Sequence, residues 1–500
     1  MNNMKDYSQT YCNPIKLPDY PYTPSANPDY NPPERKFDPS AMDADVPQNL
    51  KDVFDFTFAT DVREPYRETA DPTCMYYDEK WYLYPSCGMA YVSEDFIHWE
   101  KHEVDPAYIG HAPTVVEYHG QFLFSANSAG LWVAEDPLGP LTFVNDFHTP
   151  AGEVIKCNDP MIFADDDDRL YFYWGMDNEG IRGAELDPEK PWQLLTEPKH
   201  LFTFNPDHSW ERLGEHNEDY GNAFIEGSWM FKHGDTYYLT YSAAGTEFST
   251  YAMGCYKSKS PLSGFECQKL NPICRDTHGL VRGVGHGSIV KGPGDTLWVF
   301  YTVAVGYAGN LERRIGFDPA GIDDNGDLYT IAASEVPQWG PGLMSNPQLG
   351  NDAGLTCVSA RKSVRATSHK PGRDPLYALD ESMLTWWQPE DTDKERRLEI
   401  FLRGRFALGA VRICWRECGL DPKGGIPAGP IQYRIQVSMD GDAWTTICDM
   451  SRNENDYLVD YQTFEPVTAK YIRIEICGAP EGIHPGITDF SVFGTSVYKR

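Results

Sequence analysis

A short unit built around a β-hairpin recurs five times in the first 340 residues, and this repeat constrains the fold more than any other feature. In each copy, one polar or small residue precedes a β-rich stretch, a turn and an alternating aromatic strand. The first residues of successive copies lie 41, 47, 67 and 60 positions apart. The five copies are Asp71–Tyr84, Ala112–Phe124, Asp159–Tyr173, Glu226–Tyr241 and His286–Tyr301.

The spacing leaves room in each unit for two further strands, such as Ala129–Ala134 and Tyr251–Tyr256. A single unit of this kind cannot bury both of its faces. Four-stranded units that repeat every 40–60 residues or so are typical of a propeller, so we predict five blades. An aromatic content of 13%, with 43 Gly and 38 Pro, agrees with short strands and tight turns.

The C-terminal part is also expected to be all-β. The segments Val411–Trp415, Tyr433–Ser438 and Tyr471–Ile476 alternate apolar and polar residues, as half-buried strands of a β-sandwich do. The fold class predicted for the whole chain is therefore all-β, a five-bladed β-propeller followed by a β-sandwich. The predicted parts are an extended proline-rich segment at 1–50, the propeller at 51–340, a linker at 341–354 and the sandwich at 355–500.

The distribution of charge disfavours several classes of partner. The chain has a formal net charge of -31, and residues 351–500 hold 19 Lys+Arg and 21 Asp+Glu, so a net of -29 falls on the first 350. Binding to nucleic acid or to an anionic membrane surface needs clustered cations, and we expect neither partner. No apolar run is long enough to span a bilayer.

The twelve cysteines and the N-terminus predict a cytoplasmic location. No two cysteines form a CxxC pair, and the first residues contain no apolar segment of a secretion signal. We therefore expect reduced, mostly buried thiols. Cys414 and Cys418 lie four residues apart, but no second pair follows at zinc spacing, so a metal site is not expected there.

Three of the five unit-initial residues are acidic: Asp71, Asp159 and Glu226. The innermost strands of a propeller begin near its axis, so these carboxylates should converge from three blades. Like charges that are partly desolvated repel, and at least one carboxyl should keep its proton near neutral pH. Cleavage of a glycosidic bond needs one protonated and one ionised carboxyl. The structural alternative is that each Asp-Pro is a strand-entry turn, in which Asp caps its own backbone.

These residues resemble the blade-start motifs of glycoside hydrolase family 43. The matching motifs are Asp71-Pro, Asp159-Pro-Met-Ile-Phe, Glu226-Gly-Ser-Trp and Gly285-His286-Gly-Ser, within about residues 55–335. The resemblance implies a five-bladed propeller that inverts anomeric configuration and acts mainly on α-L-arabinofuranosides and β-D-xylosides. It also implies that Asp71 is the general base, Glu226 the general acid, and Asp159 the carboxylate that orients the acid and raises its pKa.

The same resemblance suggests further site residues. His286 matches a histidine near the propeller axis, often beside a calcium ion or a water, and Arg314 matches a substrate contact. Trp229 and Trp210 are candidates for stacking on sugar rings, with packing inside a blade as the alternative. No cofactor is expected to be required for the chemistry, although a structural calcium ion is compatible with the family. Two departures bear on substrate identity: His111 precedes Ala112-Pro113 where the family often has Trp, and 211–222 resembles an insertion.

The last domain resembles a discoidin, or coagulation factor 5/8 type C, domain. The resemblance rests on five segments and covers about residues 355–496. Such domains commonly bind carbohydrate, so this one is either a carbohydrate-binding module or a structural appendage. The segments are Ser363–Ser368, Ala378–Asp380, Thr385–Trp387, Arg397–Ile400 and Tyr471–Glu475.

The sequence thus predicts an exo-acting, inverting glycoside hydrolase that releases arabinofuranose or xylose from short plant-type oligosaccharides. One alternative is a galactofuranosidase of the same family, because furanose pockets differ by few contacts. The alternative from another class is a non-catalytic, lectin-like protein. The sugar, the linkage and the oligomeric state are left open.

Overall fold

The structure is a computed structural model that describes residues 6–23, 62–86, 88–106 and 109–498. Strands dominate, and no helix in these ranges is both long and apolar enough to cross a membrane. Every cysteine in the described ranges is free of a disulfide bond. The helices are short 3₁₀ turns: η2 (Asp177–Glu179), η3 (Ser209–Glu211), η4 (Pro293–Asp295), η5 (Pro347–Leu349) and η6 (Pro375–Leu379).

Five separate sheets follow one another between Thr73 and Thr330. The first contains β2 (Thr73–Tyr77), β3 (Lys80–Tyr84), β4 (Met89–Ser93) and β5 (Glu100–Glu103). The second contains β6 (Thr114–Tyr118), β7 (Gln121–Ser125), β8 (Leu131–Ala134) and β9 (Thr142–Asn145). The third contains β10 (Phe147–His148), β11 (Val154–Ile155), β12 (Met161–Ala164), β13 (Leu170–Met176), β14 (Gly180–Asp187), β15 (Lys190–Leu194) and β16 (Lys199–Phe202).

The fourth and fifth sheets complete the series. The fourth contains β17 (Glu226–His233), β18 (Thr236–Ala243), β19 (Ala252–Ser258), β20 (Glu266–Cys267) and β21 (Cys274–Arg275). The fifth contains β22 (Gly285–Lys291), β23 (Leu297–Ala304), β24 (Arg313–Ile322) and β25 (Leu328–Thr330). In every sheet, the first two strands of the predicted unit form an antiparallel hairpin.

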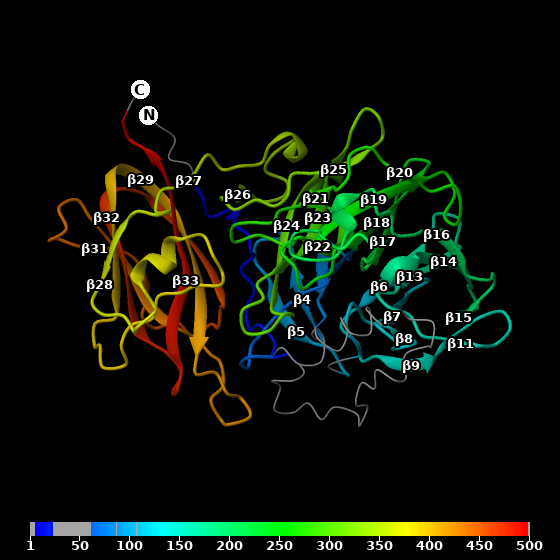
Figure 1. Cartoon of the computed structure of the whole chain (residues 1–500), viewed down its shortest axis with the longest axis horizontal. Coiled ribbons are helices and arrows are strands. Elements are labelled where there is room, and N and C mark those ends of the chain that lie inside the picture. Colours follow the sequence, from blue (N-terminus) through cyan, green and yellow to red (C-terminus); the bar gives the residue numbers. More distant parts are fainter. Residues whose placement is uncertain (1–5, 24–61, 87, 107–108, 499–500) are drawn as a thin grey trace.

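The first strands of the five hairpins contact one another in a closed series, in the order β2, β6, β12, β17, β22 and back to β2. This propeller-like arrangement confirms the predicted fold class (Figure 1). The sheets are less uniform than the predicted four-stranded units. The third has seven strands and the fourth has five, because short segments between the hairpins pair at their outer edges.

The C-terminal part forms the predicted β-sandwich, whose strands belong to one continuous hydrogen-bonded set. Two long strands run through it, and their pairing shifts register near Phe406 and Ala410. Its strands are β27 (Thr356–Cys357), β28 (Ser363–Ala366), β29 (Arg397–Cys418), β30 (Gln432–Ser438), β31 (Thr445–Met450), β32 (Val459–Gly478) and β33 (His484–Ser496).

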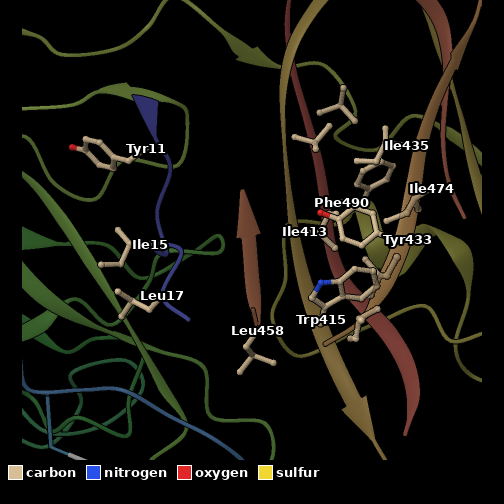
Figure 2. Packing of buried hydrophobic residues seen from close by; sticks show 14 of the residues in the cluster. Tyr11, Ile15, Leu17, Ile413, Trp415, Tyr433, Ile435, Leu458, Ile474 and Phe490 are labelled. Atoms are coloured by element: carbon tan, nitrogen blue, oxygen red, sulfur yellow. The ribbon is translucent and has the colours of Figure 1, made fainter. Parts of the chain in front are cut away.

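The described part of the N-terminal segment, residues 6–23, lies between the propeller and the sandwich (Figure 1). Its strand β1 (Thr10–Tyr11) pairs with β26 (Gln338–Trp339), which follows the propeller. Figure 2 shows Tyr11, Ile15 and Leu17 of this segment, which belong to the same buried cluster as the sandwich core. The rest of the predicted segment, 1–5 and 24–50, lies outside the described residues. The predicted domain boundaries stay predictions.

Arg67 joins the propeller to the sandwich through a buried ion cluster. Its side chain donates to both oxygens of Glu417, at 2.9 and 2.7 Å, and to Asp456 at 2.5 Å. Replacing Arg67 with alanine leaves two acids without their cation, and removal of one partner from a buried ion pair costs about 3–5 kcal/mol. We expect a clearly lower thermal unfolding midpoint, measured by scanning calorimetry.

The exposed pair Arg434–Asp449, whose side chains are 39% and 55% exposed, provides the matched control. Arg434→Ala is expected to cost at most about 1 kcal/mol, because water screens an exposed pair. Equal decreases of the thermal unfolding midpoint in the two variants would contradict the structural role of Arg67.

Candidate active site

The site is built on one backbone feature that each of the five sheets repeats. The residue at the entry to each first strand has a left-handed backbone, and its N–H donates to a side-chain oxygen of the preceding sheet. This ring of hydrogen bonds ties the five strand entries together. The pairs are Asp71 with Thr302 (2.8 Å), Ala112 with Ser86 (2.9 Å), Asp159 with Asn127 (2.6 Å), Gly227 with Asp159 (3.0 Å) and His286 with Ser242 (2.6 Å).

The ring corrects one detail of the predicted repeat. Asp71, Ala112, Asp159 and His286 have φ values of 50°, 49°, 47° and 34°, but the equivalent residue of the fourth sheet is Gly227, with φ 61°. Glu226 therefore stands one position earlier than its counterparts. A register shift between Glu226 and Trp229 accompanies this offset. The side chain of Glu226 is therefore attached one residue before the left-handed position of its strand, whereas Asp71 and Asp159 occupy that position themselves.

The three predicted carboxyls nevertheless meet. Nδ1 of His286 lies 3.4 Å from Oδ1 of Asp71 and 3.5 Å from Oδ2 of Asp159. Oδ2 of Asp159 also accepts the N–H of Gly227, the residue that follows Glu226. The hydroxyl of Tyr251 donates to Oε1 of Glu226 at 3.0 Å. Residues 155 positions apart in the chain thus share one site, as the repeat predicted.

Asp71 is held in its ionised form. Its carboxyl accepts hydrogen bonds from Arg313, at 3.1 Å, and from Ser86. Burial favours the neutral carboxyl, but the charges of Arg313 and His286 and the hydrogen bond from Ser86 together hold the pKa of Asp71 below its usual value. Asp71 is therefore suited to accept a proton.

Glu226 and Asp159 are shifted in the opposite direction. Burial raises the pKa of Glu226 well above its usual value, and the negative charges of Asp159, Glu247 and Asp71 act in the same direction. Burial also raises the pKa of Asp159, with His286 opposing the rise and Asp71 adding to it. Neighbouring carboxyls with divergent pKa values are the arrangement that separates an acid from a base.

Arg313 is a site residue that the sequence analysis missed. The motif pointed to Arg314, but consecutive strand residues point to opposite faces, and Arg313 is the one that faces Asp71. The guanidinium of Arg314 instead donates to the carbonyls of Arg67 and Arg313 and to Glu312, on the side of the sandwich. Of the two arginines, the structure thus places Arg313, and not Arg314, beside the proposed site carboxyls.

The two predicted tryptophans are packed inside the propeller. Trp210 is 8% exposed and lies 5.5 Å from the ring of Tyr241, centroid to centroid. Trp229 packs at the boundary of the fourth and fifth sheets, where its indole N–H donates to the carbonyl of Ile289 at 3.1 Å. These contacts agree with the alternative of a packed aromatic, and the sugar-stacking role of the two residues stays a prediction.

His286 does not belong to a cluster of His, Cys, Asp or Glu metal ligands among the described residues. Within those ranges, no group of three or more His, Cys, Asp or Glu side chains could hold a metal ion. The ring nitrogen Nδ1 of His286 faces the two aspartates.

Comparison with known proteins agrees with this geometry. The sequence model of glycosyl hydrolases family 43 matches residues 66–328, and that of the F5/8 type C domain matches residues 363–484. A β-xylosidase of Xylanibacter ruminicola is 28% identical over 152 residues, a match that covers 25% of this chain and 44% of that protein.

Two solved structures are similar to the chain at low sequence identity. A xylan β-1,4-xylosidase from Bacillus halodurans is 14% identical, with a TM-score of 0.43, and the match covers 86% of this chain and 98% of that one. An α-L-arabinofuranosidase from Clostridium thermocellum is 19% identical, with a TM-score of 0.40, and the match covers 57% and 98%.

Proposed function

Because the chain belongs to glycosyl hydrolases family 43, we propose that it hydrolyses glycosidic bonds and that Asp71, Asp159 and Glu226 carry the chemistry. The observation that supports this most is the opposite shift of two carboxyl pKa values within one site, below the usual value at Asp71 and well above it at Glu226. A glycosidase that inverts configuration requires such a pair, an ionised base and a protonated acid.

In the proposed mechanism, Asp71 takes a proton from a water molecule as that water attacks the anomeric carbon. Glu226 donates its proton to the departing oxygen on the opposite face of the sugar. Arg313 and Ser86 keep Asp71 ionised, and Asp159 helps to keep Glu226 protonated through its charge. Because the base and the acid act on opposite faces, the released sugar has inverted configuration.

The proposed substrates are α-L-arabinofuranosides or β-D-xylosides at the ends of short oligosaccharides. The names of the related proteins, a β-xylosidase and an α-L-arabinofuranosidase, agree with this range. A galactofuranosidase stays the alternative within the family. Carbohydrate binding by the sandwich, the cytoplasmic location and the structural calcium ion also stay proposals.

A panel of nitrophenyl glycosides tests the proposed function. We expect nitrophenol release from the arabinofuranoside, the xyloside or the galactofuranoside, and proton NMR at early times should show the inverted anomer first. Activity should fall at low pH as Asp71 is protonated, and at high pH as Glu226 loses its proton. Glycan binding without release from any probe would instead favour the lectin-like alternative.

A further inference from the structure

The loop between β18 and β19 contacts the partners of both proposed catalytic carboxyls. Near its start, the hydroxyl oxygen of Thr246 accepts a hydrogen bond at 3.3 Å from Nη1 of Arg313, the same atom that donates to Asp71. At its end, Tyr251 donates to Glu226. Glu247 follows Thr246 directly, and its carboxyl lies close enough to interact electrostatically with both Arg313 and Glu226.

Glu247 is the unusual member of this loop. Both of its carboxylate oxygens are buried, and neither accepts a hydrogen bond from any other residue in the described ranges. A buried carboxylate without a partner is costly, and native structures rarely leave one unless a ligand or water completes it. The proposed mechanism does not use this side chain.

The backbone makes room for the Glu247 carboxyl. A Cβ atom on Gly245 would lie 2.9 Å from Oε2 of Glu247 and 3.1 Å from the ring of Phe224. Gly245 also has a φ of 102°, which suits glycine alone. A side chain at position 245 would therefore displace the carboxyl, and glycine leaves its place open.

The predicted insertion at 211–222 fixes this loop from outside. The carboxyl of Glu215 accepts the backbone N–H of Ser249 at 3.0 Å and the Ser249 hydroxyl at 2.5 Å. Thr250 donates to the carbonyl of Gly214 at 2.8 Å. These hydrogen bonds between the insertion and the loop hold the loop that carries Glu247 in position.

Three charged groups influence Glu247 from the elements packed around it. They are Arg313 of β24, Glu215 of the insertion and Glu226 of β17. Burial raises the pKa of Glu247 to about 7, with its own backbone N–H and then Arg313 opposing the rise and Glu215 adding to it. Arg313 donates instead to Glu68, Asp71 and Thr246. The group that would satisfy Glu247 is therefore an external hydroxyl donor.

We propose that Glu247 binds two neighbouring hydroxyl groups of the terminal sugar that the enzyme releases. The inference rests on the proposed function. A sugar attacked by the water on Asp71 and protonated by Glu226 must lie between these residues, and Glu247 interacts electrostatically with Glu226 and with Arg313, the partner of Asp71. A carboxylate with two free oxygens accepts hydrogen bonds from hydroxyls on adjacent carbons, an arrangement that terminal pentoses offer.

The test combines two variants with a modified substrate. Kinetic constants are measured for the wild type, Glu247→Gln and Glu247→Ala on the preferred nitrophenyl glycoside and on its analogue that lacks one ring hydroxyl. A hydrogen bond to a charged group corresponds to a loss of about 10- to 100-fold in kcat/KM. We expect a loss of this size for the wild type on the deoxy analogue and for Glu247→Ala on the parent glycoside. When Glu247→Ala acts on the deoxy analogue, both partners of the hydrogen bond are missing, and kcat/KM should be little lower than when either partner alone is missing.

Glu247→Gln provides a second readout that a purely structural role would not move. It preserves the shape of the side chain but removes its negative charge from the surroundings of Glu226. The pKa of Glu226 should then fall, and the alkaline limb of the kcat profile should move to lower pH. The exposed Glu266 supplies the matched control, because Glu266→Gln removes a charge outside the site.

The possible results separate the two proposals. Two results would overturn this inference while the proposed function stands, provided that the wild type releases sugar. In the first, both Glu247 variants have unchanged kinetic constants. In the second, the missing hydroxyl lowers kcat/KM by the same factor in the wild type and in Glu247→Ala. A wild-type enzyme that cleaves no glycoside in the panel would overturn the proposed function, and this inference with it.

Discussion

Replacing Glu226 with glutamine is expected to lower kcat by about 10²- to 10⁴-fold on substrates with a poor leaving group, the usual contribution of a general acid. Glutamine keeps the shape of the side chain and can still accept the hydrogen bond from Tyr251, but it has no proton to give. The loss should be much smaller on a nitrophenyl glycoside, since a nitrophenolate departs without full protonation.

The measurement compares kcat for the variant and the wild type on an unsubstituted disaccharide and on the matching nitrophenyl glycoside. In the wild type, activity should decline as the pH rises through the raised pKa of Glu226, and Glu226→Gln should lose that alkaline limb. Thermal unfolding checks that the variant is folded. An equal loss on both substrates, with the alkaline limb retained, would show that Glu226 is not the acid.

The sequence predicts that three distant carboxyls lie close together, because residues at equivalent positions of a propeller repeat lie at equivalent places around its axis. Once the units beginning at Asp71, Asp159 and Glu226 are aligned, closure of the sheets brings their first residues together without any knowledge of intervening loops. The ring of strand-entry hydrogen bonds shows why the repeat is so regular. Each left-handed residue donates to the sheet before it.

Finer detail depends on contacts that the sequence does not encode locally. Arg313 and Arg314 have the same side chain, and only the strand register decides which one faces Asp71. The aromatic rings of Trp210 and Trp229 would suit either a sugar or a core, and the structure shows both packed against neighbouring sheets. Such choices are tertiary, and propensity or spacing cannot settle them.

Glu247 was missed for a related reason. It lies in a connection between two strands rather than in the repeated hairpin, so alignment of the units does not single it out. Its importance comes from the absence of a hydrogen-bond partner among the described residues, a property that only coordinates reveal. The sequence indicates the adjacent insertion, but not its contact with this loop. That contact is shown by the hydrogen bond that the hydroxyl of Ser249 donates to Glu215.

Replacing Asp71 with asparagine is expected to reduce kcat by about 10²- to 10⁴-fold, because the attacking water loses its general base. Asparagine suits this position better than alanine. Its amide oxygen can still accept from Arg313 or Ser86, and asparagine tolerates the left-handed backbone of residue 71, with φ 50°. The fold should therefore be preserved, which thermal unfolding verifies.

The decrease of kcat in Asp71→Asn should depend on the leaving group differently from the decrease in Glu226→Gln. Water must be activated whichever group departs, so Asp71→Asn should impair the nitrophenyl glycoside and the unsubstituted disaccharide to a similar degree. The wild-type acidic limb, where activity declines as the pH falls through the lowered pKa of Asp71, should disappear in the residual activity. Near-normal turnover by Asp71→Asn, or a loss confined to poor leaving groups, would remove Asp71 from the role of base and leave its ion pair with Arg313 as a structural contact.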